Sequence, residues 1–451
     1  MGLLGFLKKR AAKPRVMIVG LDGVPYSFLA KQIAAGKMPN LAKLAGKGSL
    51  VQADSIHPCV SCVAWTSYST GRNPGKHGIF GFQDRKPGTY DTYIATGAHM
   101  KAETMWETLS RRGKRVIALN IPGSYPPKPV NGLMVGDFLS PRLEGATYPA
   151  DLASRLEVMG YRIDIDPAKG RQEDKGPLLE DLHETLAARK RTMFALMKEE
   201  EWDVMQVHFM GTDRIAHFLI EQWEQGDPRY APEFERYFAA IDNMLGELDA
   251  ELDDRTALLS LSDHGFCSIK REVFVNRWLQ ENGFLEELAG ERPKLDQLTT
   301  ASRAYSMDPG RIYVNLKGRE PNGSVEAGGE YEASLAELTE ALLAMTCPET
   351  GERVVSQVLR RDELFQGPHA AQGPDLVAYP FDGYDLKGQL GRPEVFFKGS
   401  LVGMHTFDDA FWYVRGREFS GRPKVMDGAP TVLALLGEEP EPDMDGEPRV
   451  E

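Results

Sequence analysis

Cysteine is scarce in this sequence, and long apolar runs are absent. Four cysteines in 451 residues, at positions 59, 62, 267 and 347, do not make the framework of a disulfide-stabilised secreted domain. A helix that crosses a bilayer needs about 20 consecutive apolar residues, and the sequence contains no such run. These two absences exclude a disulfide scaffold and an integral membrane protein.

The first residues of the chain, MGLLGFLKKRAAKPR, do not follow the order of a signal peptide. A signal peptide has basic residues before a longer apolar stretch, whereas here Lys8, Lys9 and Arg10 follow a short one. We predict that residues 1–14 form a flexible leader without a stable membrane anchor, in a cytoplasmic protein. Weak contact of this leader with a membrane surface is the second interpretation.

Positive charge is also in deficit. The chain has 53 Lys+Arg against 66 Asp+Glu, a formal net charge of -13. Nucleic acid polymers are bound through clustered Lys and Arg, so we predict that they are not partners. A small phosphorylated substrate is compatible with this charge, because bound divalent cations can supply local positive charge. The sequence leaves the oligomeric state open.

Short apolar runs alternate with segments of helical period. The runs have the character of strands buried in a parallel sheet, and they lie at 15–23, 114–120, 132–137, 203–209 and 256–262. The helical segments between them are 103–111, 178–199 and 233–251. This alternation predicts an α/β fold with a mainly parallel sheet flanked by helices.

The texture of the sequence changes between residues 268 and 369. A Gly/Pro-rich connection at 309–330 and a charged helical segment at 334–345 replace the apolar strands. We predict a smaller cap-like subdomain over 268–369, beside a catalytic core formed by 15–267 and 370–451. The second part of the core is predicted to contain strands at 374–380 and 410–416 and a helix at 430–437.

Acidic residues and histidines follow several predicted strands. Asp22 follows the first strand, Asp213 the fourth, and Asp263 and His264 the fifth. Ligands of open α/β sheets bind beyond the carboxyl ends of the strands, so these side chains predict a polar site at one edge. His217 lies four residues after Asp213, a spacing that on a helix lets both residues share a cation. His405 is predicted in a glycine-containing loop before a strand.

Ser61 precedes a predicted short helix, 62–70, that Gly71, Asn73 and Pro74 end. A helix N-terminus stabilises an alkoxide and an incoming phosphate oxygen. A serine in this place is more often an N-cap, and a single Asp–His pair is more often solvated. The combination nevertheless predicts two metal sites, about 4 Å apart, that clamp an in-line displacement. Mixed Asp and His ligands favour zinc, with manganese second.

The segments that contain these residues, and their order along the chain, resemble the alkaline phosphatase superfamily. Within it, they resemble the bacterial and archaeal type I phosphodiesterase / nucleotide pyrophosphatase-like proteins. The matching motifs cover nearly the whole chain: VGLDG (19–23), SCVAWTSYSTGRNPGKHGIF (61–80), DRIAH (213–217), SDHGF (262–266), GMHTFDD (403–409) and APTVLALLG with DMDG (429–446). The resemblance implies an alkaline-phosphatase-like fold. It also implies one zinc ion on Asp22, Asp263 and His264, and a second on Asp213, His217 and His405. Ser61 would bridge the two ions as the nucleophile and form a phosphoseryl intermediate.

Two positions depart from the pattern of nucleotide pyrophosphatases. Those enzymes have a Thr nucleophile where this chain has Ser61, and an Asn that steadies the phosphoryl oxygen where it has Phe82. Phosphate binding must then depend on the metals and on the N–H groups near Ser61 and Cys62. The departures leave nucleotides open as substrates.

Other functions meet the sequence pattern only in part. A sulfatase would need Cys or Ser in Cys/Ser-x-Pro-x-Arg, and neither Cys59 nor Cys62 has that context. These two cysteines form a C-x-x-C, but no second pair completes a zinc site. A mutase-like phosphotransferase with a Ser nucleophile, a phosphomonoesterase and a binding protein without chemistry remain alternatives. The prediction is a metal-dependent phosphoryl-transfer hydrolase of the phosphodiesterase type, acting on a small phosphorylated substrate.

Overall fold

The computed structural model describes residues 13–290 and 292–450, so the predicted leader lies almost wholly outside the described residues. Its largest element is an eight-stranded sheet with the order β2-β19-β9-β1-β8-β5-β6-β7. The five strands from β9 to β6 are parallel, whereas β19 and β7 run antiparallel to their neighbours. The strands are β1 (Arg15–Leu21), β2 (Gly48–Ala53), β5 (Val116–Leu119), β6 (Gly132–Val135), β7 (Thr147–Tyr148), β8 (Val204–Phe209), β9 (Thr256–Leu261) and β19 (Ala410–Arg415).

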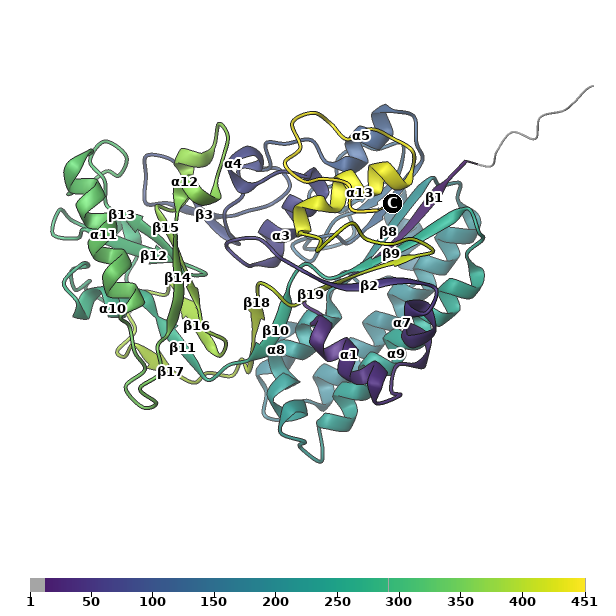
Figure 1. Ribbon diagram of the computed structural model, residues 1–451, viewed down its shortest axis with the longest axis horizontal. Coiled ribbons are helices and arrows are strands. Elements are labelled where there is room, and N and C mark those ends of the chain that lie inside the picture. The colour runs from purple at the N-terminus through teal and green to yellow at the C-terminus, as the bar shows by residue number, and fades with distance from the viewer. Residues whose placement is uncertain (1–12, 291, 451) are drawn as a thin grey trace, which may run out of the picture.

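Helices cover both faces of this sheet (Figure 1). Successive side chains of a strand point to opposite faces, so Val16 and Ile18 pack in one hydrophobic cluster and Met17 and Val19 in another. The first cluster is completed by α3 (Ser61–Thr70), α5 (Met105–Arg111) and α13 (Gly428–Leu435). The second contains α1 (Tyr26–Ala34), α2 (Pro39–Ala45), α6 (Leu152–Val158), α7 (Gly176–Glu199), α8 (Gly211–Glu224) and α9 (Ala231–Glu251). The α/β fold and its five predicted parallel strands are confirmed.

A smaller lobe lies beside the main sheet (Figure 1). It contains an antiparallel sheet of the order β12-β13-β15-β14, with α10 and α11, and a three-stranded sheet β16-β11-β17. The strand expected at 374–380 is β15 and pairs with β13 and β14, so it belongs to this lobe's sheet and not to the main one. The elements are α10 (Val275–Glu281), α11 (Gly329–Leu343), β11 (Arg271–Phe274), β12 (Ala304–Met307), β13 (Arg311–Val314), β14 (Val355–Arg360), β15 (Leu376–Pro380), β16 (Tyr384–Lys387) and β17 (Phe396–Phe397).

A two-stranded ribbon lies between the two parts. Strand β10 (Gly265–Ser268) pairs with β18 (Gly403–Thr406), and Phe266 is opposite His405. The prediction that His405 lies in a loop is therefore wrong. Gly403 explains the difference, because a Cβ there would lie 2.5 Å from the Ala216 carbonyl oxygen of α8. Only glycine lets β18 come this close to the helix.

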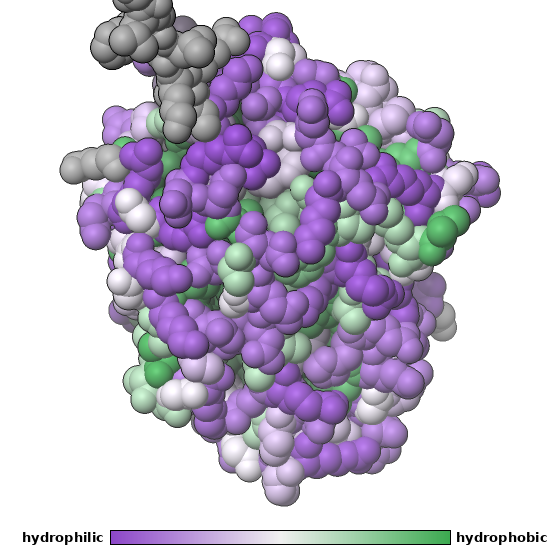
Figure 2. Space-filling view, turned by 90° about the vertical axis from the view of Figure 1, so that its right-hand side faces the viewer, coloured by the Kyte–Doolittle hydropathy of each residue, from purple (hydrophilic) through white to green (hydrophobic). Residues whose placement is uncertain are grey.

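The remaining short elements connect these layers: α4 (Pro74–His77), α12 (Arg361–Leu364), β3 (Gln83–Arg85) and β4 (Thr92–Ile94). The face shown in Figure 2 is mostly hydrophilic, and its hydrophobic residues occur in small groups, as on the surface of most folded domains. Among the described residues, no helix is long and apolar enough to span a membrane.

Candidate metal centre

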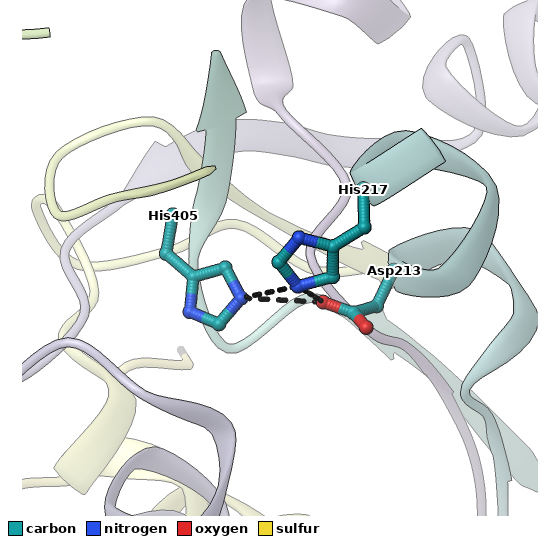
Figure 3. Close-up of side chains that lie close together, drawn as sticks. All are labelled: Asp213, His217 and His405. Atoms are coloured by element: carbon teal, nitrogen blue, oxygen red, sulfur yellow. Dashed lines mark hydrogen bonds and ion pairs between the residues drawn. The ribbon is translucent and has the colours of Figure 1, made fainter. Parts of the chain in front are cut away.

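Asp213, His217 and His405 converge at the carboxyl edge of the main sheet (Figure 3). Asp213 and His217 are one turn apart on α8, and His405 comes from β18. The Nε2 atoms of both histidines lie 3.3 Å from Asp213 Oδ1, and they lie 3.2 Å from each other. Three ligand atoms from two elements therefore face one small volume.

The opposite ring nitrogens of the histidines face backbone carbonyls. His217 Nδ1 lies 2.8 Å from the Gly403 carbonyl oxygen, and His264 Nδ1 lies 2.9 Å from the Gly265 carbonyl oxygen. His405 Nδ1 lies 3.4 Å from the Cys59 carbonyl oxygen. A carbonyl only accepts, so each Nδ1 carries the proton and each Nε2 presents a lone pair. Two lone pairs that face each other repel unless a cation lies between them. Backbone acceptors behind the ring are also the usual support of a metal-bound histidine.

The second group surrounds Ser61. Its hydroxyl donates to Asp22 Oδ1 at 3.2 Å, and its oxygen lies 3.2 Å from His264 Nε2. Asp263 completes the group, and the ligand atoms of Asp22, Asp263 and His264 lie within 4.8 Å of one another. Ser61 is the first residue of α3, so its N–H and that of Cys62 precede the first helical bond, from Val63 to Val60. This end of the helix can therefore bind an anion beside the Ser61 hydroxyl.

Glycine also shapes this second group. Gly23, which follows Asp22, has φ +63 and lies against the rings of Phe266 and His264. Its N–H donates to Asp263 Oδ1 at 3.2 Å. A side chain in this position would strain the backbone and displace His264. The Asp-Gly turn after β1 is therefore needed to bring Asp22 and Asp263 together.

Among the described residues, the centre contains buried carboxyl groups that no neighbouring Lys or Arg side chain fully neutralises. Asp22 and Asp263 are fully buried, and burial together with the Asp22 carboxylate holds the pKa of Asp263 well above its usual range. Burial, assisted by His405, lowers the pKa of His264 to about 3. Neutral imidazoles and buried carboxylates are the donor set that a divalent cation requires.

Two buried carboxylate oxygens support this fit. Asp213 Oδ1 and Asp263 Oδ2, one from each group, accept no hydrogen bond from any described residue. Such an oxygen is costly to bury unless a cation or a donor satisfies it. The two groups adjoin, because the rings of His264 and His405 stack with centroids 3.7 Å apart. The residues present therefore fit two neighbouring cations.

The structure thus brings the seven predicted site residues to one edge of the sheet. Among the described residues, the Ser61 hydroxyl contacts Asp22 and His264 but no member of the Asp213 group. Sequence reasoning missed two supports of Asp22. Trp65 Nε1 donates to Asp22 Oδ2 at 2.9 Å, and His208 Nε2 lies 3.1 Å from the same oxygen. A histidine near the end of β8, the strand beside β1, was the available signal.

Phe82 lies beside the centre and contributes an apolar ring to its surroundings. Its ring is 39% exposed and stacks near Phe138, with centroids 6.3 Å apart. It lines a cavity that His217 and His405 also line. A phenyl ring offers no hydrogen bond to a phosphoryl oxygen, so this position contributes shape rather than polarity.

Comparison with known proteins identifies the fold and the family. The model of the family "Type I phosphodiesterase / nucleotide pyrophosphatase" matches residues 16–408. Phosphonoacetate hydrolase from Sinorhizobium meliloti 1021, solved with phosphonoformate, is 18% identical with a TM-score of 0.65, over 94% of this chain and 96% of its own. An inactive form of murine ectonucleotide pyrophosphatase / phosphodiesterase 5, in complex with AMP, is 14% identical with a TM-score of 0.58, over 95% and 96%. Alkaline phosphatase PafA is 14% identical with a TM-score of 0.56, over 97% and 98%.

These structures define the class: the protein has the fold of the alkaline phosphatase superfamily, with a large mixed sheet flanked by helices. The family match covers most of the chain and is more specific. The chain belongs to the type I phosphodiesterase / nucleotide pyrophosphatase family. It is accordingly a phosphoryl-transfer enzyme that hydrolyses phosphoric esters.

Proposed function

We propose that the protein is a metal-dependent phosphodiesterase that acts on a small phosphorylated substrate through a phosphoseryl intermediate on Ser61. One proposed cation is held by Asp22, Asp263 and His264, and the other by Asp213, His217 and His405. Zinc is the proposed metal, with manganese second. The observation that carries the proposal is the Ser61 hydroxyl, 3.2 Å from both Asp22 and His264 at a helix N-terminus.

The side chains divide the chemistry between them. Ser61 Oγ attacks phosphorus, the Oγ–P bond forms, the bond to the leaving oxygen breaks, and the Ser61 hydroxyl proton ends on that oxygen. Water then attacks the same phosphorus, the Oγ–P bond breaks, and one proton of the water returns to Ser61 Oγ. When bound, the cations would supply positive charge that lowers the pKa of the Ser61 hydroxyl and stabilises the phosphoryl oxygens. Trp65 holds Asp22 Oδ2, which leaves Oδ1 directed at Ser61.

The first N–H groups of α3 are proposed to bind a phosphoryl oxygen. In this chain Phe82 replaces the Asn that serves this purpose in nucleotide pyrophosphatases. The N–H groups of Ser61 and Cys62 precede the first helical hydrogen bond, so they are directed out of the helix beside the nucleophile. This arrangement supplies donors without a side-chain amide.

We also propose the division into a catalytic core, 15–267 and 370–451, and a cap, 268–369. In support, a separate hydrophobic cluster joins Leu298, Tyr305 and Leu338 of the proposed cap. Leu376 and Leu386 of β15 and β16 pack in the same cluster, so these two strands of the second core segment lie with the cap. The cap is proposed to shape the choice of substrate. A cytoplasmic location stays a prediction from the sequence.

Ser61→Ala tests the proposed nucleophile. Hydrolysis of bis(p-nitrophenyl) phosphate, a p-nitrophenyl monoester and a nucleoside triphosphate would be compared with zinc and then with manganese. The wild type is expected to prefer the diester, and Ser61→Ala to lose at least about 10³-fold in rate. Metal content should not change, because the six Asp and His ligands remain. Ser69→Ala, which is buried in the same helix, is the matched control. Retained diester hydrolysis in Ser61→Ala would contradict the assignment.

A further inference from the structure

A cavity opens directly beside the candidate metal centre. His217 and His405 form one side of it, and the loop before Ser61, including Pro58 and Val60, forms another. The opposite walls come from β15 and β16 of the smaller lobe. An ester group attached to a phosphoryl group at the centre would therefore extend into this cavity. A role for this cavity in choosing the ester group rests on the proposed function.

The cavity is small and mainly apolar. Its volume is about 160 Å³, and Phe82, Leu386 and Met404 are among the apolar side chains that line it. An apolar cavity of about 150 Å³ takes up one benzene molecule. The space therefore matches a single aromatic ring or a short branched alkyl group. The base and the sugar of a nucleoside together exceed it.

Phe82 lies at the boundary between this cavity and a much wider one. The wider cavity has a volume of about 1100 Å³, and Phe82 and Asp308 line both. Because the Phe82 ring is part of the boundary, its size limits how far an ester group can extend. Removing the ring would widen the boundary, where Asp308 would remain.

The charges at the far end of the cavity disfavour a second anion. Lys387 is the only lysine or arginine among the described residues that line the cavity. Its Nζ already lies 2.5 Å from Asp385 Oδ2, and Asp308 adds a second carboxylate. Burial lowers the pKa of His57, on the near wall, to about 4, so its ring is neutral near pH 7. An additional phosphate or carboxylate would find no unpaired cation there.

We infer that this cavity selects phosphoric esters whose organic group is compact, aromatic or apolar, and uncharged, and that Phe82 is a specificity-determining residue. Nucleotides and esters with a second anionic group are disfavoured. Recognition depends on the fit of one ring between Phe82, the histidine side of the centre and the smaller lobe. Lys387 and Asp385 exclude further negative charge.

Binding of phosphonates to the zinc-loaded full chain tests this inference by calorimetry. Phenylphosphonate is expected to bind at least about 10-fold more tightly than methylphosphonate, because its ring is buried in the cavity. Thymidine 5′-monophosphate and 4-carboxyphenylphosphonate should each bind at least about 10-fold more weakly than phenylphosphonate. A nucleotide that binds as tightly as phenylphosphonate would overturn the inference.

Two variants test the residues. Phe82→Ala should reduce the preference for phenylphosphonate over thymidine 5′-monophosphate to less than about 3-fold. Phe397→Ala, with a ring of similar exposure away from this cavity, should leave the preference unchanged. Asp385→Asn should release Lys387 and remove most of the penalty on the carboxylated ligand. If Phe82→Ala keeps the wild-type preference for phenylphosphonate over thymidine 5′-monophosphate, the proposed role of the Phe82 ring is wrong. If Asp385→Asn still binds 4-carboxyphenylphosphonate as weakly as wild type, the proposed role of the Lys387–Asp385 ion pair is wrong.

The two proposals can fail separately. If the wild type shows the expected order of phosphonate affinities but hydrolyses no diester, the proposed function is wrong and the selective cavity stands. If it hydrolyses bis(p-nitrophenyl) phosphate but binds all phosphonates alike, the proposed function stands and the selectivity is wrong.

Discussion

Gly403→Ala should weaken one cation site more than the other. A Cβ at position 403 would lie 2.5 Å from the Ala216 carbonyl oxygen and 2.6 Å from the Phe266 ring. Ordinary contacts of a Cβ begin at 3.4 Å, so β18 must move away from α8 by about 0.9 Å. His405 lies on β18, and the Gly403 carbonyl holds the His217 ring. One substitution therefore displaces two of the three proposed ligands.

The size of this shift determines the expected effect. A nitrogen ligand of zinc lies at about 2.0–2.1 Å, and a competent site tolerates errors of about 0.2 Å. A displacement of 0.9 Å exceeds that tolerance several-fold. We expect about 10- to 100-fold weaker binding at the Asp213 group, which is the usual cost of losing a support of a metal ligand. The Asp22 group contains no residue of β18 and meets it through the stacked rings of His264 and His405, so its affinity should change less.

Zinc retained per chain, measured by elemental analysis during titration with a competing chelator, checks this expectation. Wild type should release two ions, whereas Gly403→Ala should release one of them at a lower chelator concentration. Gly329→Ala is the matched control, because a Cβ at Gly329 would meet no atom within 4 Å. A Gly403→Ala protein that folds and keeps both ions with wild-type affinity would refute this account of the centre.

Two further predictions concern stability. His77 is fully buried and accepts from the Ile79 N–H through Nδ1, and burial, with Arg72 and His369, lowers its pKa to about 3. The unfolded chain therefore binds a proton below pH about 6.5 that the folded chain does not, so stability should fall with decreasing pH between about 6.5 and 3, by about 1.4 kcal/mol per pH unit. Urea unfolding at pH 7, 6 and 5 should show a shallower loss in His77→Gln than in wild type, and parallel losses would contradict the role of His77. Arg311 is buried and pairs with Asp84 at 2.6 Å, so Arg311→Met should lower the free energy of unfolding by about 3–5 kcal/mol, because it leaves a buried carboxylate unpaired. Asp84→Asn in the Arg311→Met background should recover part of this loss, and a loss under about 1 kcal/mol in Arg311→Met would count against the pair.

The main sheet could be predicted from the sequence because its strands are buried on both faces. Continuous apolar runs such as 203–209 are a local signal, and β8 occupies Val204–Phe209. Strand β18 has no such signal. Its four residues include a histidine and a glycine, and it becomes a strand only through pairing with β10 and contact with α8. The position of β15 in the smaller lobe likewise depends on partners that are distant in the sequence.

The centre shows the same limit. Its acidic residues and histidines could be named because motifs place them after strands or one helical turn apart. Their supports could not, because the Gly403 and Gly265 carbonyls are backbone atoms that any residue carries. His208 could not be distinguished from a core histidine, since its relation to Asp22 requires the pairing of β1 with β8. Residue types were predictable, whereas tautomers and orientations required the tertiary structure.

This dependence on tertiary structure also links the centre to the stability of the protein. The proposed ligands of one cation come from residues 22, 263 and 264, and those of the other from residues 213, 217 and 405. The three residues of each set are not close together in an unfolded chain, so cations would bind almost only to the native state. Binding would then stabilise the fold by about 4 kcal/mol for each ion present at 1,000 times its dissociation constant. Strand β10 follows β9 of the main sheet, and its partner β18 follows the strands of the smaller lobe. Cation binding would therefore stabilise the connection between the two parts as well as the main sheet.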